Sequence, residues 1–122
     1  MRLMSFALTT PQILNRTKTV TRRCGWTFLK PGDLLQAIEK GQGLKKGEHV
    51  RRLAVLRVVS VGRQPLSAIG NAYHVDDCRR EGFPEMSPAE FIEMFCRSHK
   101  GCSPTTIVTR IEFSYEDISR RG

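Results

Sequence analysis

The chain has 122 residues, the size of one globular domain, with 39% hydrophobic and 26% charged residues. This composition excludes an intrinsically disordered chain, and the length allows a core that needs neither metal nor disulfide. Twenty Lys and Arg against twelve Asp and Glu give a formal net charge of +8. Such a charge favours polyanionic partners, or serves solubility alone.

Targeting and membrane segments are not expected. The apolar start, Met1–Leu8, is short and is interrupted by Thr9-Thr10-Pro11, and no apolar run has the length needed to cross a bilayer. We therefore expect a cytoplasmic protein whose four cysteines are reduced thiols.

One cysteine pattern is a weak candidate for a metal site. Cys96-x2-His99-x2-Cys102, with Cys78 upstream, contains the residue types of a zinc site made of three cysteines and one histidine. The spacing lacks paired CxxC motifs, and Cys96 falls in an expected helix, so core or loop thiols are the favoured interpretation. No metal or cofactor is expected.

The first third of the chain predicts a strand at residues 3–8, then a helix of little more than one turn that begins at Thr10-Pro11. Residues 17–23 are expected to form a strand with Thr19, Thr21 and Arg23 on one face. Lys18 lies at the turn into this strand, so side-chain alternation does not fix its direction.

The middle of the chain begins with a predicted type II turn at Lys30-Pro31-Gly32-Asp33 and a strand at residues 34–39. Residues 41–48 form a Gly- and Lys-rich loop that either contacts a phosphate backbone or is a solvated hairpin tip. Residues 50–61 predict the strongest strand, apolar on both faces over its middle, as in a barrel wall covered by helices.

The last third contains a capping box at Ser87-Pro88-Ala89-Glu90, which opens a helix with a core stripe of Phe91, Met94 and Phe95. A short helix or a turn is expected at residues 65–69, a helical segment at 72–80, and a final strand at 105–113. This order predicts an α+β, mainly β fold: a small barrel of five to six mostly antiparallel strands with short flanking helices. We expect one domain over residues 1–118, with a loose basic tail at 119–122.

Three stretches, Ile13–Arg23, Leu29–Asp33 and Glu81–Phe83, resemble an ASCH domain of the PUA-like superfamily, and the similarity covers nearly the whole chain. The family signature is Gly-x-Lys-x-x-Glu-x-Arg. Lys18 and Arg23 match this signature.

Two signature positions differ in this chain. Arg16 stands at the Gly position and Thr21 at the Glu position. The lost Gly suggests that Asn15 adopts the left-handed conformation in the turn instead. The Thr resembles the subgroup of ASCH proteins that includes the bacterial N4-acetylcytidine amidohydrolase.

The resemblance implies a PUA-like β-barrel with a cleft beside the signature, and ligands that are RNA, modified bases or nucleosides. The proposed catalytic Lys, Thr and Glu of the amidohydrolase correspond to Lys18, Thr21 and Glu81. Burial and the neighbouring Arg22 and Arg23 would lower the pKa of Lys18, which could then take a proton from Thr21 or from water.

A non-catalytic RNA-binding module is the alternative, using the same cleft for one base and the basic loop for the backbone. The candidate substrate- or RNA-binding residues are Arg16, Arg22, Arg23, Trp26, Lys45, Lys46, Arg51, Arg52 and Tyr73. A ribonuclease ranks below both, since His49, His74 and His99 are scattered and lie outside the signature.

Overall fold

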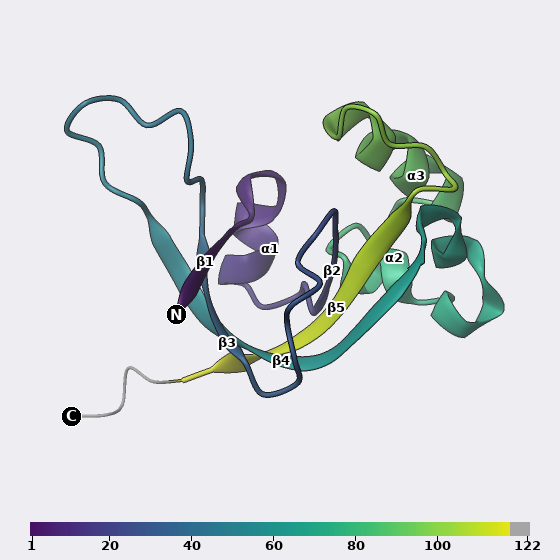
Figure 1. Ribbon diagram of the computed structural model, residues 1–122, viewed down its shortest axis with the longest axis horizontal. Helices are drawn as coiled ribbons and strands as arrows, with labels where there is room; N and C mark the ends of the chain where they lie inside the picture. Colours follow the sequence, from purple (N-terminus) through teal and green to yellow (C-terminus); the bar gives the residue numbers. More distant parts are fainter. Residues whose placement is uncertain (118–122) are drawn as a thin grey trace.

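The computed structural model describes residues 1–117, which contain a five-stranded mixed sheet curled into a half-barrel (Figure 1). The strands lie in the order β1-β3-β4-β5-β2. β1 pairs with β3 in parallel, and the other pairs are antiparallel. Their bounds are β1 Arg2–Ser5, β2 Val20–Arg23, β3 Leu34–Ile38, β4 Arg52–Pro65 and β5 Ile107–Glu116. The predicted mainly antiparallel α+β fold is confirmed, but as an open sheet with β1 and β2 at its edges.

Within residues 1–117, three short α-helices and three 3-10 segments accompany the sheet. The α-helices are α1 (Thr10–Leu14), α2 (Asp77–Arg80) and α3 (Pro88–Ser98), and the 3-10 segments are η1 (Ala7–Thr9), η2 (Leu66–Gly70) and η3 (Ala72–His74). The capping box of α3 is confirmed, because the Ser87 hydroxyl accepts from the Glu90 amide and the Glu90 carboxylate accepts from the Ser87 amide. The strand predicted at residues 3–8 ends at Ser5 and continues as η1, and the helix predicted at 72–80 is split into η3 and α2. The predicted tail at 119–122 lies outside the described residues.

β4 and β5 pair along most of their length and form the long curved ribbon that crosses the molecule (Figure 1). In β4, Leu56 and Val58 are buried, whereas Arg57 and Val59 are exposed. The prediction that this strand is a barrel wall covered by helices is therefore wrong around Val59. Apolar residues on both faces of the sequence pattern do not require that both faces are buried.

The core has two parts. One packs the inner face of the sheet against η1 and α1, and includes Phe6, Ile13 and Ile111. The other lies beneath α3 and includes Phe91 and Phe95. The edge strand β2 enters this region after a turn of unexpected geometry, and the candidate site lies where the two parts meet.

That turn follows α1 and precedes Lys18. Arg16 has φ 62, whereas Asn15 has φ −90. The expectation that Asn15 supplies the left-handed conformation is therefore wrong: the residue at the family's Gly position supplies it, although it is Arg. The Asn15 side chain stabilises the turn by accepting hydrogen bonds from the backbone and hydroxyl of Thr17. The type II turn is confirmed, with Gly32 at φ 95 and the Asp33 amide donating to the Lys30 carbonyl.

Candidate active site

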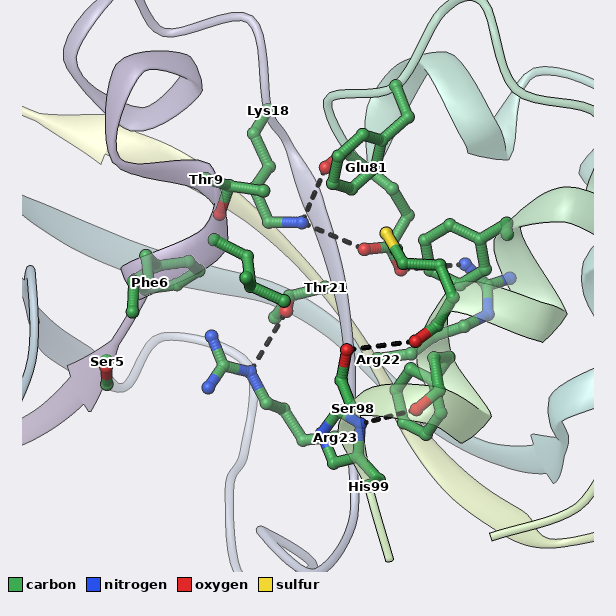
Figure 2. A pocket seen from close by; sticks show the side chains of 16 residues that line it. Ser5, Phe6, Thr9, Lys18, Thr21, Arg22, Arg23, Glu81, Ser98 and His99 are labelled. Atoms are coloured by element: carbon green, nitrogen blue, oxygen red, sulfur yellow. Dashed lines mark hydrogen bonds and ion pairs between the residues drawn. The ribbon is translucent and has the colours of Figure 1, made fainter.

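A cavity of about 230 Å³ lies between β2, η1, α3 and the segment after α2. Its polar wall carries Lys18, Thr21, Arg23 and Glu81, which Figure 2 shows together. The Lys18 amine and the Thr21 hydroxyl thus line the same cavity, as the hydrolase hypothesis requires.

Lys18 is 3% exposed and reaches across to the turn after α2. Its Nζ donates to the backbone oxygen of Glu81 at 2.6 Å and to Oε1 of Glu81 at 2.8 Å (Figure 2). No third hydrogen-bond partner of Nζ occurs among residues 1–117. One direction on the tetrahedral nitrogen therefore remains, for a proton in the ammonium form or a lone pair in the amine form.

Glu81 is held in turn by Arg22, whose side chain is fully buried. Arg22 donates to Glu81 Oε2 at 3.0 Å and to Asp77 Oδ2 at 2.6 Å. Arg110 also donates to both carboxylate oxygens of Asp77. Because both oxygens of Glu81 are engaged, the carboxylate has a fixed orientation toward Lys18.

Arg23 lies on the same face of β2 as Thr21. Its Nε donates to Thr21 Oγ1 at 3.0 Å, and its guanidinium lies 4.6 Å from the centre of the Phe6 ring. No carboxylate within residues 1–117 forms an ion pair with Arg23. Arg23 therefore places positive charge beside the Thr21 hydroxyl and keeps hydrogen-bond donors available toward the cavity.

Burial changes the proton affinity of both basic groups. It lowers the pKa of Lys18 below its ordinary value of 10.5; Glu81 opposes this change, and Arg23 and Arg22 add to it. Burial also lowers the pKa of Arg23 to about 10, again against Glu81. The predicted direction for Lys18 is therefore confirmed, with burial as the first cause.

The opposite wall of the cavity is apolar and comes mainly from α3 and the chain before it. It carries Phe83, Phe91, Met94 and Phe95, and the His99 ring stacks on Phe95 with ring centres 3.9 Å apart. The stripe of α3 was predicted to be core alone. It is core on one side, but it also lines the cavity.

Sequence reasoning missed His99 and Ser98 as cavity residues. A signal for His99 exists, since Phe91, Phe95 and His99 follow one another at intervals of four residues. It also missed Asp77, because nothing in the local pattern indicates that this carboxylate is buried against Arg22.

The remaining predicted binding residues lie away from the cavity lining. Arg16 is exposed and stacks over Tyr115, Trp26 packs against Phe28, and Tyr73 is 91% exposed on η3. Lys45, Lys46, Arg51 and Arg52 lie in or beside the loop between β3 and β4. This loop projects at the end of the molecule opposite α3 (Figure 1).

The four residues of the weak zinc candidate, Cys78, Cys96, His99 and Cys102, do not come together in the structure. Within the described part of the chain, no three His, Cys, Asp or Glu side chains are placed to hold a metal ion. Cys78 is buried in the core beneath α3, His99 stacks on Phe95, and the Cys102 thiol faces Cys24 instead of Cys96. Over residues 1–117 there is likewise no helix with the length and apolarity to cross a membrane.

No family model and no curated protein matches the sequence. Solved structures do match. An ASCH domain from Lactobacillus crispatus JV V101 superposes with a TM-score of 0.60 at 14% identity, over 93% of this chain and 78% of that one. A point mutant of ZmASCH from Zymomonas mobilis gives 0.59 at 10% identity, over 97% and 76%. The hypothetical protein PH0355 gives 0.64 at 13% identity, over 94% and 97%.

These similarities establish that the chain has the fold of these ASCH domain structures. At such low identity they show the fold alone.

Proposed function

We propose that the cavity hydrolyses an amide on a nucleobase, with N4-acetylcytidine as the representative substrate. The observation that carries this proposal is the placement of a buried lysine, held by a fixed carboxylate, and a threonine hydroxyl in one cavity. The substrate class follows from the resemblance of Lys18, Thr21 and Glu81 to the amidohydrolase subgroup.

The chemistry assigns one role to each group. The neutral amine of Lys18 accepts the proton of Thr21 Oγ as this oxygen attacks the amide carbonyl. Arg23 stabilises the negative charge on oxygen. The proton then passes from Lys18 to the leaving nitrogen, the C–N bond breaks, and cytidine departs. Water hydrolyses the resulting threonine ester, releasing acetate and restoring the hydroxyl.

Two of the three cations that line the cavity are already held in ion pairs, which suits a neutral ligand with one polar oxygen. Lys18 is paired with the buried carboxylate of Glu81. Arg22 is paired with the buried carboxylates of Glu81 and Asp77. The unpaired cation among the described lining residues is Arg23, which suits a carbonyl oxygen or a developing oxyanion. The aromatic wall formed by Phe83, Phe91 and Phe95 suits a planar base.

The experiment is incubation of the wild type with N4-acetylcytidine, with chromatography to detect cytidine. We expect cytidine from the wild type, and a loss of at least about 100-fold in kcat for Lys18→Ala and Thr21→Ala. Lys46→Ala, in the exposed loop, is the matched control and should retain full activity. No cytidine from the wild type, or full activity in Lys18→Ala, would overturn the proposal.

A second candidate function, RNA binding, is favoured by the separate basic loop. Lys45, Lys46, Arg51 and Arg52 are exposed there, although Arg51 pairs with Glu39. Binding through this loop should weaken steeply with salt, because bound phosphates release counterions. Binding of a neutral nucleoside in the cavity should change little. A salt titration of RNA and of N4-acetylcytidine binding separates the two functions.

A further inference from the structure

Two cysteines that are 78 residues apart in sequence face each other beside the cavity. The sulfur atoms of Cys24 and Cys102 lie 3.5 Å apart. Cys24 is exposed and Cys102 is half-buried, so a small reagent can reach the pair from the Cys24 side. Neither residue lines the cavity itself.

The fold positions each sulfur through its own turn. Cys24 directly follows β2, and the next residue, Gly25, has φ 76 and accepts a hydrogen bond from the Thr109 hydroxyl on β5. Cys102 lies in the turn after α3, where its amide donates to the His99 carbonyl at 3.1 Å. The contact therefore joins two anchored turns.

The 3.5 Å separation of the two sulfur atoms is longer than a covalent bond between them would be. A disulfide has an S–S length of about 2.05 Å, so the sulfurs need to approach by about 1.5 Å. Both residues lie in turns outside regular strands and helices, where side-chain rotation and small backbone shifts can supply this movement. Cys78 is buried beneath α3, and Cys96 lies on that helix, so neither has the same arrangement.

We propose that Cys24 and Cys102 form a dithiol site that reacts with small-molecule disulfides to give an intramolecular disulfide. The thiolate of Cys24 attacks one sulfur of the reagent, which leaves one reagent thiolate and a mixed disulfide on Cys24. The thiolate of Cys102 then attacks the Cys24 sulfur and releases the second reagent thiolate. The protein dithiol loses two electrons and two protons, and one reagent disulfide is reduced to two thiols.

The chemistry predicts a rate that rises with pH, since the thiolate is the nucleophile. Burial and the hydrogen bond to Cys102 raise the pKa of Cys24, so the reaction is slower at neutral pH than that of an isolated thiol. The bond would tie the end of β2, next to Arg23, to the turn that follows His99. Both of those neighbours line the cavity, so the bond would link two segments that each carry a cavity residue.

The test is treatment of the folded protein, without denaturant, with excess oxidised glutathione, followed by intact mass and peptide mapping. We expect a loss of two hydrogens with a cross-link between Cys24 and Cys102, and a rise of several degrees in Tm because the bond closes a long loop. In the Cys102→Ser variant, the reaction should stop at the mixed disulfide, with one glutathione attached to Cys24. Cys96→Ser should still form the cross-link.

Two results would overturn the proposal. One is a stable glutathione adduct on wild-type Cys24 with no internal bond. The other is a cross-link through Cys78 or Cys96. The proposal is independent of the hydrolytic function, because mass and Tm are measured without substrate.

Discussion

Lys18 Nζ lies 2.8 Å from Oε1 of Glu81, and both residues are about 3% exposed. A single charge at such depth would cost several kcal/mol in lost hydration. Here the lysine is one end of a buried chain of charges that runs through Glu81 and Arg22 to Asp77. Arg110 also pairs with Asp77 at the other end of this chain, so each of the two buried carboxylates faces at least two cations. Arg23 is the lining cation that has no carboxylate partner among residues 1–117.

Removing the charge of Glu81 should destabilise the fold more than removing that of Lys18. Glu81→Gln leaves Lys18 without a carboxylate and weakens one pair of Arg22, so we expect a loss of about 3 kcal/mol in the free energy of unfolding. Lys18→Met leaves Glu81 still paired with Arg22, and the loss should be smaller. Urea denaturation measures both.

Glu85→Gln is the control for this comparison, because Glu85 is exposed and four residues away. Its effect should stay within about 0.5 kcal/mol. Equal losses for Glu81→Gln and Lys18→Met would contradict the asymmetry that the ion pairs imply.

The pH dependence of the proposed hydrolysis should follow the protonation state of Lys18. As pH rises, the fraction of neutral amine increases, so kcat/KM should increase and level off at a pH below 10.5, since burial lowers the pKa of Lys18. The Glu81 carboxylate raises the pKa of Lys18, so Glu81→Gln should shift the rise of kcat/KM to lower pH. A rate that falls as pH rises through this range would exclude Lys18 as the base.

Acid should weaken the fold through Asp77. Burial alone would raise the pKa of this carboxyl, but hydrogen bonds from Arg110 and Arg22 outweigh it and lower the pKa from 3.8 to about 2. A depressed carboxyl pKa gives stability that is present above 3.8 and is lost as pH falls toward 2. The loss amounts to about 2 kcal/mol at ~1.4 kcal/mol per pKa unit.

The measurement is urea denaturation at a series of pH values across this window. Asp77→Asn should flatten the slope of the free energy of unfolding against pH in this window. Asp76→Asn, which changes an exposed neighbour, should leave most of that slope. An unchanged slope in Asp77→Asn would assign the acid sensitivity to other carboxyls.

The turn before Lys18 should tolerate Gly and reject a β-branched residue. Arg16 has φ 62, a conformation that costs L residues about 1–2 kcal/mol and Gly almost nothing. Arg16→Gly should therefore be at least about 1 kcal/mol more stable than Arg16→Val in thermal or urea unfolding. Both variants lose the contact over Tyr115, so this contact cancels in the comparison. Equal stabilities would show that the turn relaxes to another conformation.

The sequence predicted those features that depend on neighbours in the chain. The capping box of α3 and the type II turn at Gly32 follow from residue types at fixed short spacing, and both are confirmed. The direction of Lys18 does not follow from such rules. Lys18 precedes β2, and the next amide, of Thr19, bonds to the Arg80 carbonyl, so its orientation depends on a segment about sixty residues away.

The aromatic wall shows a second limit. Helical periodicity indicates that Phe91 and Phe95 are buried, but it does not distinguish a packed core from the wall of a cavity. That distinction depends on how closely Phe6 and η1 approach from the other side, which the local pattern does not contain. The resemblance to ASCH domains indicated Glu81, and the structure adds its contact with Lys18.

Gly82 fixes the backbone beside Glu81. Gly82 has φ 101, and a Cβ atom there would lie 2.9 Å from Cγ of Gln12, whose side chain donates to the Gly82 carbonyl. Gly82→Ala should therefore combine backbone strain with a clash and shift the Glu81 carbonyl away from Lys18. Gly47→Ala is the matched control: φ is 89, but nothing lies within 4 Å of the added Cβ.

We expect Gly82→Ala to lose at least about 1 kcal/mol more in the free energy of unfolding than Gly47→Ala. We also expect it to lower hydrolysis of N4-acetylcytidine at a temperature where the variant remains folded. Equal stability of the two variants would mean that Gln12 moves aside without cost, and that Gly82 is required for its backbone conformation alone.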